Sequence, residues 1–180
     1  MTQSINKIFQ SLCVCLLFGS AAAEVIVGKV VGVADGDTVT VLDATKTQHK
    51  IRLSGIDAPE NAQPFGQRSK ENLSRLVFGK QFEVDTEKID RYGRNVGKIR
   101  VGGVDANLEQ ISAGLAWHYK KYEREQSAED RGVYARAETA ARAARAGLWR
   151  DATQTAPWDW RGCRRGQAGA VDVDCGLSPR

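Results

Sequence analysis

Hydrophobic and polar positions alternate along several short stretches in the first half of the chain. Residues 25–33 are rich in β-branched side chains and punctuated by glycine, which is typical of a strand that bends around a small barrel. Residues 38–41 and 50–53 alternate, and the second stretch places Ile51 and Leu53 on the core face and Arg52 on the opposite face. Residues 81–84 and 96–101 are two further strand candidates. The pattern therefore predicts five short strands.

The apolar spacing changes to that of a helix in three other segments. Residues 64–78 place Leu73, Leu76 and Val77 on one stripe before Gly79 ends the helix. Further helices are expected over 104–113 and 128–146, and residues 55–60 are expected to form a loop. The predicted fold is α+β: a five-stranded Greek-key barrel of the oligonucleotide/oligosaccharide-binding (OB) type with three helices packed against it.

The first residues differ in character from the rest. A segment with one lysine and no acid leads into an apolar run over about 8–18, followed by small residues up to Ala23. This order indicates a secretory signal peptide over 1–23, and a buried helix or a membrane anchor is the alternative. The run is short for a bilayer span. We therefore expect export to the periplasm or the extracellular space, with no stable membrane association after the signal is removed.

The remaining chain has the size and composition of a single soluble domain. The 180 residues are 42% hydrophobic and 27% charged, and we expect a domain over 24–150 and a C-terminal extension over 151–180. Without residues 1–23 the chain has 25 basic and 22 acidic residues, a net charge of +3 that permits nucleic-acid binding. No feature argues for an oligomer, so a monomer is expected.

Two cysteines remain after the signal peptide, Cys163 and Cys175. An even pair in an exported chain predicts one disulfide that closes the extension, and two free thiols are the alternative. A zinc site is disfavoured because no histidine or third cysteine is near. Trp158 and Trp160, in the same extension, are interpreted as packing anchors.

Three acids lie beside the predicted strands: Asp37, Asp57 and Glu60. If the strands over 38–41 and 50–53 pair, these carboxylates can converge at one end of the barrel. Oxygen ligands suit calcium or magnesium. Taken alone, the Asp-Gly pair at 35–36 indicates a hairpin turn and Glu60 a surface acid.

Two arginines lie near the same strand ends, Arg52 and Arg94. Their planar guanidinium groups match a phosphate. Taken alone, Arg52 is a solvated strand residue and Arg94 an ion-pair partner of Asp90, so a surface ion-pair cluster remains an alternative. A metal site combined with two arginines is what phosphodiester cleavage requires.

Three motifs resemble those of the staphylococcal nuclease (thermonuclease) family. Asp-Gly-Asp-Thr at 35–38, Arg-Leu-x-Gly-Ile-Asp-Ala-Pro-Glu at 52–60 and Asp-x-Tyr-Gly-Arg at 90–94 occur in that family's order, and the resemblance covers about residues 25–150. It implies a calcium-dependent endo- or exonuclease that hydrolyses DNA and RNA with little sequence preference. Single strands would be favoured, and the products would carry 3′-phosphates.

The resemblance also implies a role for each matching residue. The Asp37 and Asp57 carboxylates and the Ala58 carbonyl would bind Ca²⁺, and Glu60 would be the general base. Arg52 and Arg94 would bind the scissile phosphate.

Three further residues match substrate contacts of that family. Tyr92 would contact a terminal phosphate with Arg91 as its basic neighbour, and Tyr122 would stack on a base. Lys120 stands where some relatives have tyrosine, which affects nucleotide preference. The basic run from Lys120 to Arg124 is either a nucleic-acid rim or a solvated loop.

Other functional interpretations explain fewer of these residues. His49 and His118 lack the spacing of a catalytic or metal-binding pair and are interpreted as non-catalytic. A non-catalytic nucleic-acid-binding OB module would not need the acids and arginines together. A calcium- or carbohydrate-binding barrel gives no reason for both arginines.

Overall fold

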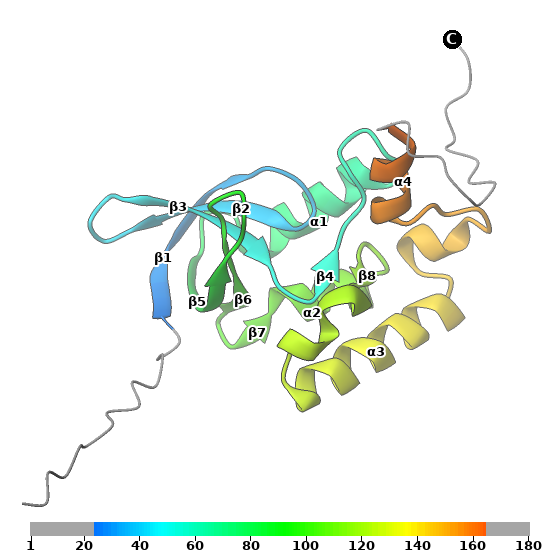
Figure 1. The fold of residues 1–180 in the computed structure, drawn as a ribbon. Helices are drawn as coiled ribbons and strands as arrows, with labels where there is room; N and C mark the ends of the chain where they lie inside the picture. Colours follow the sequence, from blue (N-terminus) through cyan, green and yellow to red (C-terminus); the bar gives the residue numbers. More distant parts are fainter. Residues whose placement is uncertain (1–23, 165–180) are drawn as a thin grey trace, which may run out of the picture.

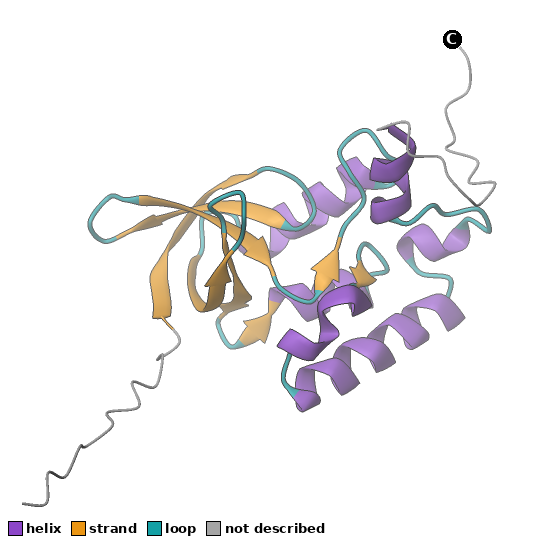
Figure 2. Cartoon of the chain, viewed as in Figure 1, coloured by secondary structure: helices purple, strands orange, loops and turns teal. Residues whose placement is uncertain are grey.

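The protein folds as a small barrel with helices on one side (Figures 1 and 2). The computed structural model describes residues 24–164, so the expected signal peptide and Cys175 lie outside the described residues. The barrel strands are β1 (Glu24–Val33), β2 (Thr38–Asp43), β3 (Gln48–Leu53), β5 (Gln81–Ile89) and β6 (Asn95–Val101). The remaining strands are short: β4 (Ile56–Asp57), β7 (Val104–Asp105) and β8 (Trp117–His118).

The barrel closes through a parallel pairing between β3 and β6. The sheet order is β3-β2-β1-β5-β6-β7, and the additional pairing of the first strand, β3, with β6 closes the five long strands into a barrel. The predicted five-stranded OB-type barrel is therefore confirmed. In the antiparallel β2–β3 ladder Thr38 lies opposite Arg52. This register brings the turn before β2 beside the end of β3, where the predicted site residues lie.

The barrel core follows the alternation seen in the sequence. Val39 and Val41 on β2 and Ile51 and Leu53 on β3 are almost fully buried, while the intervening Arg52 lies on the other face of β3 with 14% of its side chain exposed. Side chains two positions apart lie on the same face of a strand, so the core fixes where Arg52 points.

Helices α1 (Gly66–Val77), α2 (Ala106–Ser112) and α3 (Ala128–Ala143) cover one side of the barrel. Helix α1 contacts β1 and α2, and α2 contacts β6 and α3. The helix expected over 104–113 is shorter, because residues 104–105 form β7 and Asp105 then caps α2 by accepting a hydrogen bond from the Leu108 amide.

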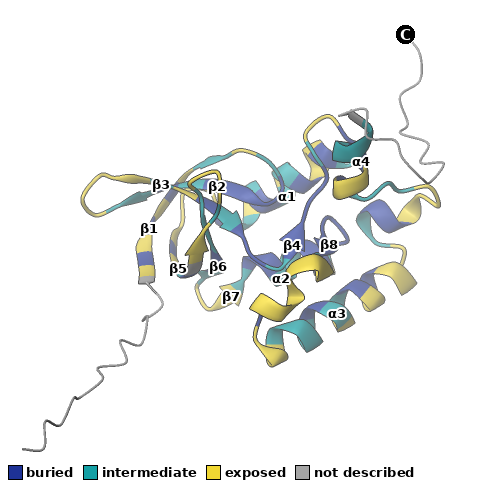
Figure 3. Cartoon of the chain, in the orientation of Figure 1, coloured by how far each residue is buried: buried dark blue, intermediate teal, exposed yellow. Residues whose placement is uncertain are grey.

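A loop was expected over residues 55–60, and this prediction is wrong for the two central residues. Ile56 and Asp57 form β4, which pairs with β8, and all four residues of this small sheet are buried (Figure 3). A two-residue strand has no periodicity that a sequence could reveal. The pairing fixes Asp57 in a rigid, buried position.

The chain continues through two 3₁₀ helices, η1 (Lys120–Glu125) and η2 (Gly147–Arg150), to α4 (Pro157–Arg164). Cys163 in α4 is disulfide-bonded, and its pairing with Cys175 remains a prediction. Within residues 24–164, no helix has the length and apolar character needed to span a membrane.

Candidate active site

Asp37 lies in the tight turn between β1 and β2 and is almost fully buried. Its backbone amide donates to Asp35 Oδ1 at 3.0 Å, which closes the turn that Asp-Gly predicts. Its own carboxylate accepts hydrogen bonds from Thr38 Oγ1 at 3.0 Å and from the Ala58 amide at 2.8 Å. The last bond joins the turn directly to the segment after β4.

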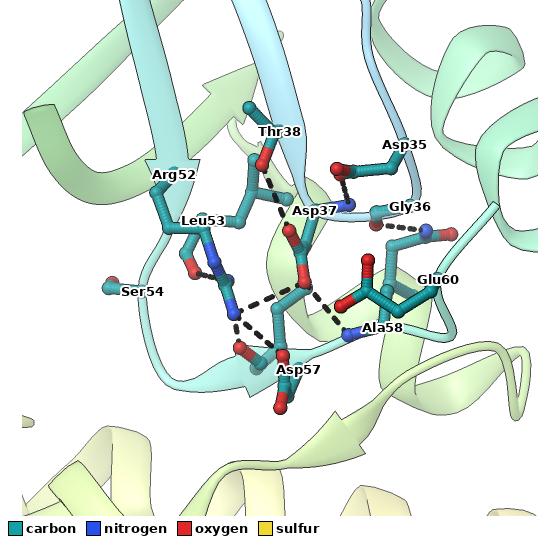
Figure 4. Close-up of polar contacts among 12 residues, drawn as sticks. Asp35, Gly36, Asp37, Thr38, Arg52, Leu53, Ser54, Asp57, Ala58 and Glu60 are labelled. Atoms are coloured by element: carbon teal, nitrogen blue, oxygen red, sulfur yellow. Dashed lines mark hydrogen bonds and ion pairs between the residues drawn. The ribbon is translucent and has the colours of Figure 1, made fainter. Parts of the chain in front are cut away.

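Arg52 connects Asp37 to Asp57 (Figure 4). Its Nη1 donates to the carbonyls of Leu53 and Ile56 at 2.7 and 2.9 Å, which fixes the guanidinium across the bend after β3. Its Nη2 lies 2.9 Å from Asp57 Oδ1 and 3.2 Å from Asp37 Oδ2. The two acids predicted to bind a metal are therefore brought together around one arginine.

Burial shifts the ionisation of the acids at this site. Burial, opposed by Arg161 and Arg52, raises the pKa of Asp57 above its usual range, and the negative charge of Asp37 adds to the rise. Burial and the charge of Asp37 raise the pKa of Asp35 to about 7. Both carboxyls therefore bind a proton more readily than a free aspartate does, and a cation bound beside them would favour their charged forms.

The residues present fit a hard divalent cation. Asp37 and Asp57 supply carboxylate oxygens, and the Ala58 carbonyl lies in the segment that Asp37 already holds. This oxygen-only set suits Ca²⁺ or Mg²⁺. Among residues 24–164 there is no group of three or more His, Cys, Asp or Glu side chains able to hold a metal. Coordination would therefore need the backbone carbonyl and water in addition to the two carboxylates.

Glu60 lies at the start of the connection from β4 to α1, next to the two buried acids. Gln63 accepts a hydrogen bond from the Glu60 amide at 3.1 Å, and the Gln63 amide donates to the Glu60 carbonyl at 2.8 Å. A Cβ on Gly66 would lie 1.9 Å from the Glu60 carbonyl oxygen, so only glycine permits this approach. The Glu60 side chain is 37% exposed, which leaves it accessible to water.

Arg94 reaches the same rim from the turn between β5 and β6. Its Nε and Nη2 lie 2.8 and 2.7 Å from Asp90 Oδ2, and its Nη1 donates to Thr38 Oγ1 at 3.4 Å. Partial burial works against the charge of Asp90, but hydrogen bonds from Arg94 and Tyr92 lower its pKa overall. Asp90 therefore holds Arg94 beside the turn that carries Asp37.

Tyr92 and Arg91 lie on the surface of this turn. Tyr92 is 67% exposed, and its hydroxyl accepts a hydrogen bond from Arg91 Nη2 at 2.7 Å. Both Arg91 and Arg94 also lie over its ring. The aromatic face and two positive charges are available to a nucleotide next to Arg94.

Tyr122 lies in η1. Its ring meets Tyr119 edge-on at 5.3 Å and lies under Lys88 and Lys121. Burial and the charge of Asp57 raise the pKa of the Tyr119 hydroxyl above its ordinary value. Tyr119 was not among the site residues predicted from the sequence.

An open pocket of about 410 Å³ lies beside Tyr119. Aromatic and charged side chains line it, among them Trp117, Tyr119, Lys120, Lys121, Arg142 and Trp158. The predicted basic rim thus includes a concave surface, although Lys120 and Arg142 already form ion pairs with Glu138.

Both histidines have structural partners. His49 Nε2 lies 2.7 Å from Asp43 Oδ2, and the buried His118 contacts Gln126 Oε1 through its Nε2 at 2.8 Å. Neither contacts the acids at the barrel rim in the described contacts.

Arg161 on α4 is the main site residue that sequence reasoning missed. Its Nη2 lies 2.7 Å from Asp57 Oδ2 and its Nη1 lies 2.7 Å from Glu60 Oε1. No motif in the sequence marks it, because it follows the apparently structural Trp158 and Trp160. The only available signal was a basic residue close to two aromatic anchors.

An OB-type barrel with clustered oxygen ligands and arginines at one rim is the arrangement that a phosphodiester-cleaving hydrolase needs. Comparison with known proteins gives the family: residues 50–151 match the model of the staphylococcal nuclease homologues. The chain belongs to the staphylococcal nuclease family, whose members are metal-dependent nucleases.

Named relatives agree with this assignment. A micrococcal nuclease of Shigella flexneri is 37% identical over 143 residues, which cover 74% of this chain and 79% of the relative. An endonuclease of Haemophilus influenzae is 38% identical over 133 residues, covering 74% and 71% of the two chains. A staphylococcal-like nuclease of Arabidopsis thaliana is 40% identical over 117 residues, 65% of this chain. The chain spans only about a third of its plant relatives, 34% of this one and 35% of one from Capnoides sempervirens.

Proposed function

We propose that the protein is a calcium-dependent nuclease that hydrolyses phosphodiester bonds in DNA and RNA with little sequence preference. The observation that carries this proposal is the convergence of Asp37 and Asp57 on Arg52, with Glu60 on the adjoining segment. A bound Ca²⁺ would neutralise a non-bridging phosphate oxygen and lower the charge that opposes attack.

The chain's own residues supply the remaining chemistry. Glu60 is accessible to water and takes a proton from the attacking water molecule, whose oxygen bonds to phosphorus while the P–O5′ bond breaks. The 5′-oxygen leaves and takes up a proton from solvent. Arg52 and Arg94 donate hydrogen bonds to the equatorial phosphate oxygens, where negative charge grows during attack. Because these contacts are made to the backbone of the substrate, they carry no information about base sequence.

The surface residues favour single-stranded substrates. Tyr92 is exposed beside Arg91 and Arg94, and Tyr122 is exposed beside Lys88 and Lys121. Rings flanked by positive charges stack on unpaired bases and pair with the phosphate groups between them. We propose that the products carry 3′-phosphates and that the enzyme acts as a monomer. The N-terminal segment supports export to the periplasm or beyond.

Digestion of heat-denatured DNA and of RNA in a calcium titration tests the proposal. Cleavage should rise with Ca²⁺ and stop when a chelator is added, and end analysis should find 3′-phosphates. Cleavage that persists in excess chelator would refute the metal dependence. Nucleic-acid binding without cleavage at any calcium concentration would instead indicate a non-catalytic OB module.

A further inference from the structure

Helix α4 is packed against the active-site side of the domain. Figure 1 shows it beside the connection from β4 to α1. Trp158 stacks on Tyr119 with ring centroids 5.5 Å apart and an interplanar angle of 20°. Trp160 is 5% exposed, and Gln63 donates a hydrogen bond to the Thr155 carbonyl just before the helix. These anchors fix the segment that carries Arg161.

Arg161 and Arg52 meet at the same carboxylate. Arg52 Nη2 lies 2.9 Å from Asp57 Oδ1, and Arg161 Nη1 lies 3.3 Å from that same oxygen. Arg161 also contacts Asp57 Oδ2 and Glu60 Oε1, each at 2.7 Å. The guanidinium from α4 therefore joins a candidate metal ligand, Asp57, to the candidate base, Glu60.

Arg161 keeps donors for a further partner. A guanidinium has five N–H groups. The described contacts of Arg161 use both hydrogens of Nη1 and one of Nη2, so Nε and the second Nη2 hydrogen are not used in them. Arg52, by comparison, donates both Nη1 hydrogens to backbone carbonyls. The Arg161 side chain is 34% exposed, so part of it faces the solvent from which a substrate would bind.

The charge of the site points in the same direction. Asp37, Asp57 and Glu60 carry three negative charges, and Arg52 and Arg161 carry two positive ones. One divalent cation would then leave a single positive charge, which matches a phosphodiester anion. Without Arg161 the same site would be neutral, and the charge that grows on the phosphate during attack would be less well balanced.

We propose that Arg161 is a third phosphate-binding arginine of the active site, supplied by the C-terminal helix α4. This inference rests on the proposed nuclease function and extends its substrate contacts beyond residues 50–151, the part of the chain that the family model matches. The domain without α4 would accordingly be an incomplete enzyme.

Binding of a fluorescent single-stranded oligonucleotide, measured in chelator over a salt series, tests this without catalysis. Arg161→Gln should reduce the slope of log affinity against log salt by about 0.7, the value of one phosphate contact. Arg161→Lys keeps the charge and should keep the slope. Arg150→Gln, an exposed arginine on η2, is the matched control and should leave the slope unchanged.

Cleavage by the same full-length variants gives the second measurement. Arg161→Gln should lower kcat about 10- to 100-fold, and Arg161→Lys should lower it less, with melting temperatures recorded to confirm folding. A slope and rate equal to those of Arg150→Gln would overturn the proposal. Faster cleavage with tighter Ca²⁺ binding in Arg161→Gln would also overturn it and show that Arg161 blocks the metal site. If the unmodified protein cleaves nothing, the nuclease function fails, while the salt slope still decides the role of Arg161.

Discussion

Gly36 sets the distance between the two halves of the candidate metal site. A Cβ at this position would lie 1.9 Å from Ser69 Oγ and 2.7 Å from both Ser69 Cβ and Ala58 Cβ. Ser69 cannot move aside easily, because it is fully buried and its hydroxyl donates to the Leu115 carbonyl at 2.7 Å. Gly36→Ala must therefore push the Asp37 turn away from Ala58.

The cost can be worked out from these contacts. Overpacking of a buried site costs about 1–3 kcal/mol, and loss of the Ser69 hydrogen bond adds about 1 kcal/mol. At about 3 °C per kcal/mol for a domain of this size, the melting temperature should fall by about 6–12 °C. Cleavage well below the melting temperature should fall about 10- to 100-fold, because the Asp37–Ala58 contact that holds the ligands together is displaced.

Thermal melts by circular dichroism and initial rates of DNA cleavage measure both effects. Gly132→Ala in α3 is the matched control, since its Cβ would meet only the flexible end of Arg136 at 3.2 Å. Alanine there should stabilise the helix by about 0.5–1 kcal/mol. A Gly36→Ala protein that melts and cleaves like the unmodified one would refute the packing argument.

Three other substitutions test separate parts of the account. Arg52→Ala should reduce cleavage by about 10²–10³-fold in steady-state assays, whereas a loss no larger than that of Arg150→Gln would contradict its role. Leu73→Ala should lower the free energy of unfolding in urea by about 2–5 kcal/mol, because Leu73 is fully buried, and an unchanged value would show that the core is misdescribed. The pKa of Asp90 lies below its ordinary 3.8, so the charged carboxylate stabilises the fold at pH values above 3.8. This stabilisation is lost as the pH falls through the lowered pKa. In Asp90→Asn the melting temperature should therefore fall less between about pH 5 and pH 2. Cleavage should also slow, because Arg94 loses the partner that holds it. A melting temperature that falls with pH as in the unmodified protein would contradict this.

The sequence allowed the barrel and the side of β3 that carries Arg52 to be predicted. Alternation over residues 50–53 defines two faces, and the apolar face must enter the core. The Asp-Gly pair before β2 indicated a turn, and the structure places Asp37 in it. These are local signals, readable within a few residues.

The contribution of α4 could not be predicted in the same way. Arg161 lies 101 residues from Glu60 along the chain, and their contact depends on how Trp158 and Trp160 pack. The β4–β8 pairing is equally non-local and only two residues long. Both features depend on tertiary contacts between segments whose local sequence patterns are unremarkable.

The role of Glu60 is the most direct test of the proposed chemistry. Single-turnover cleavage of single-stranded DNA should be about 10²–10⁴-fold slower in Glu60→Gln, with oligonucleotide affinity and melting temperature close to those of the unmodified protein. That result would assign Glu60 to the chemical step. A Glu60→Gln protein that cleaves at nearly the normal rate would contradict the account, because Glu60 is the group to which the proposed chemistry assigns the proton of the attacking water.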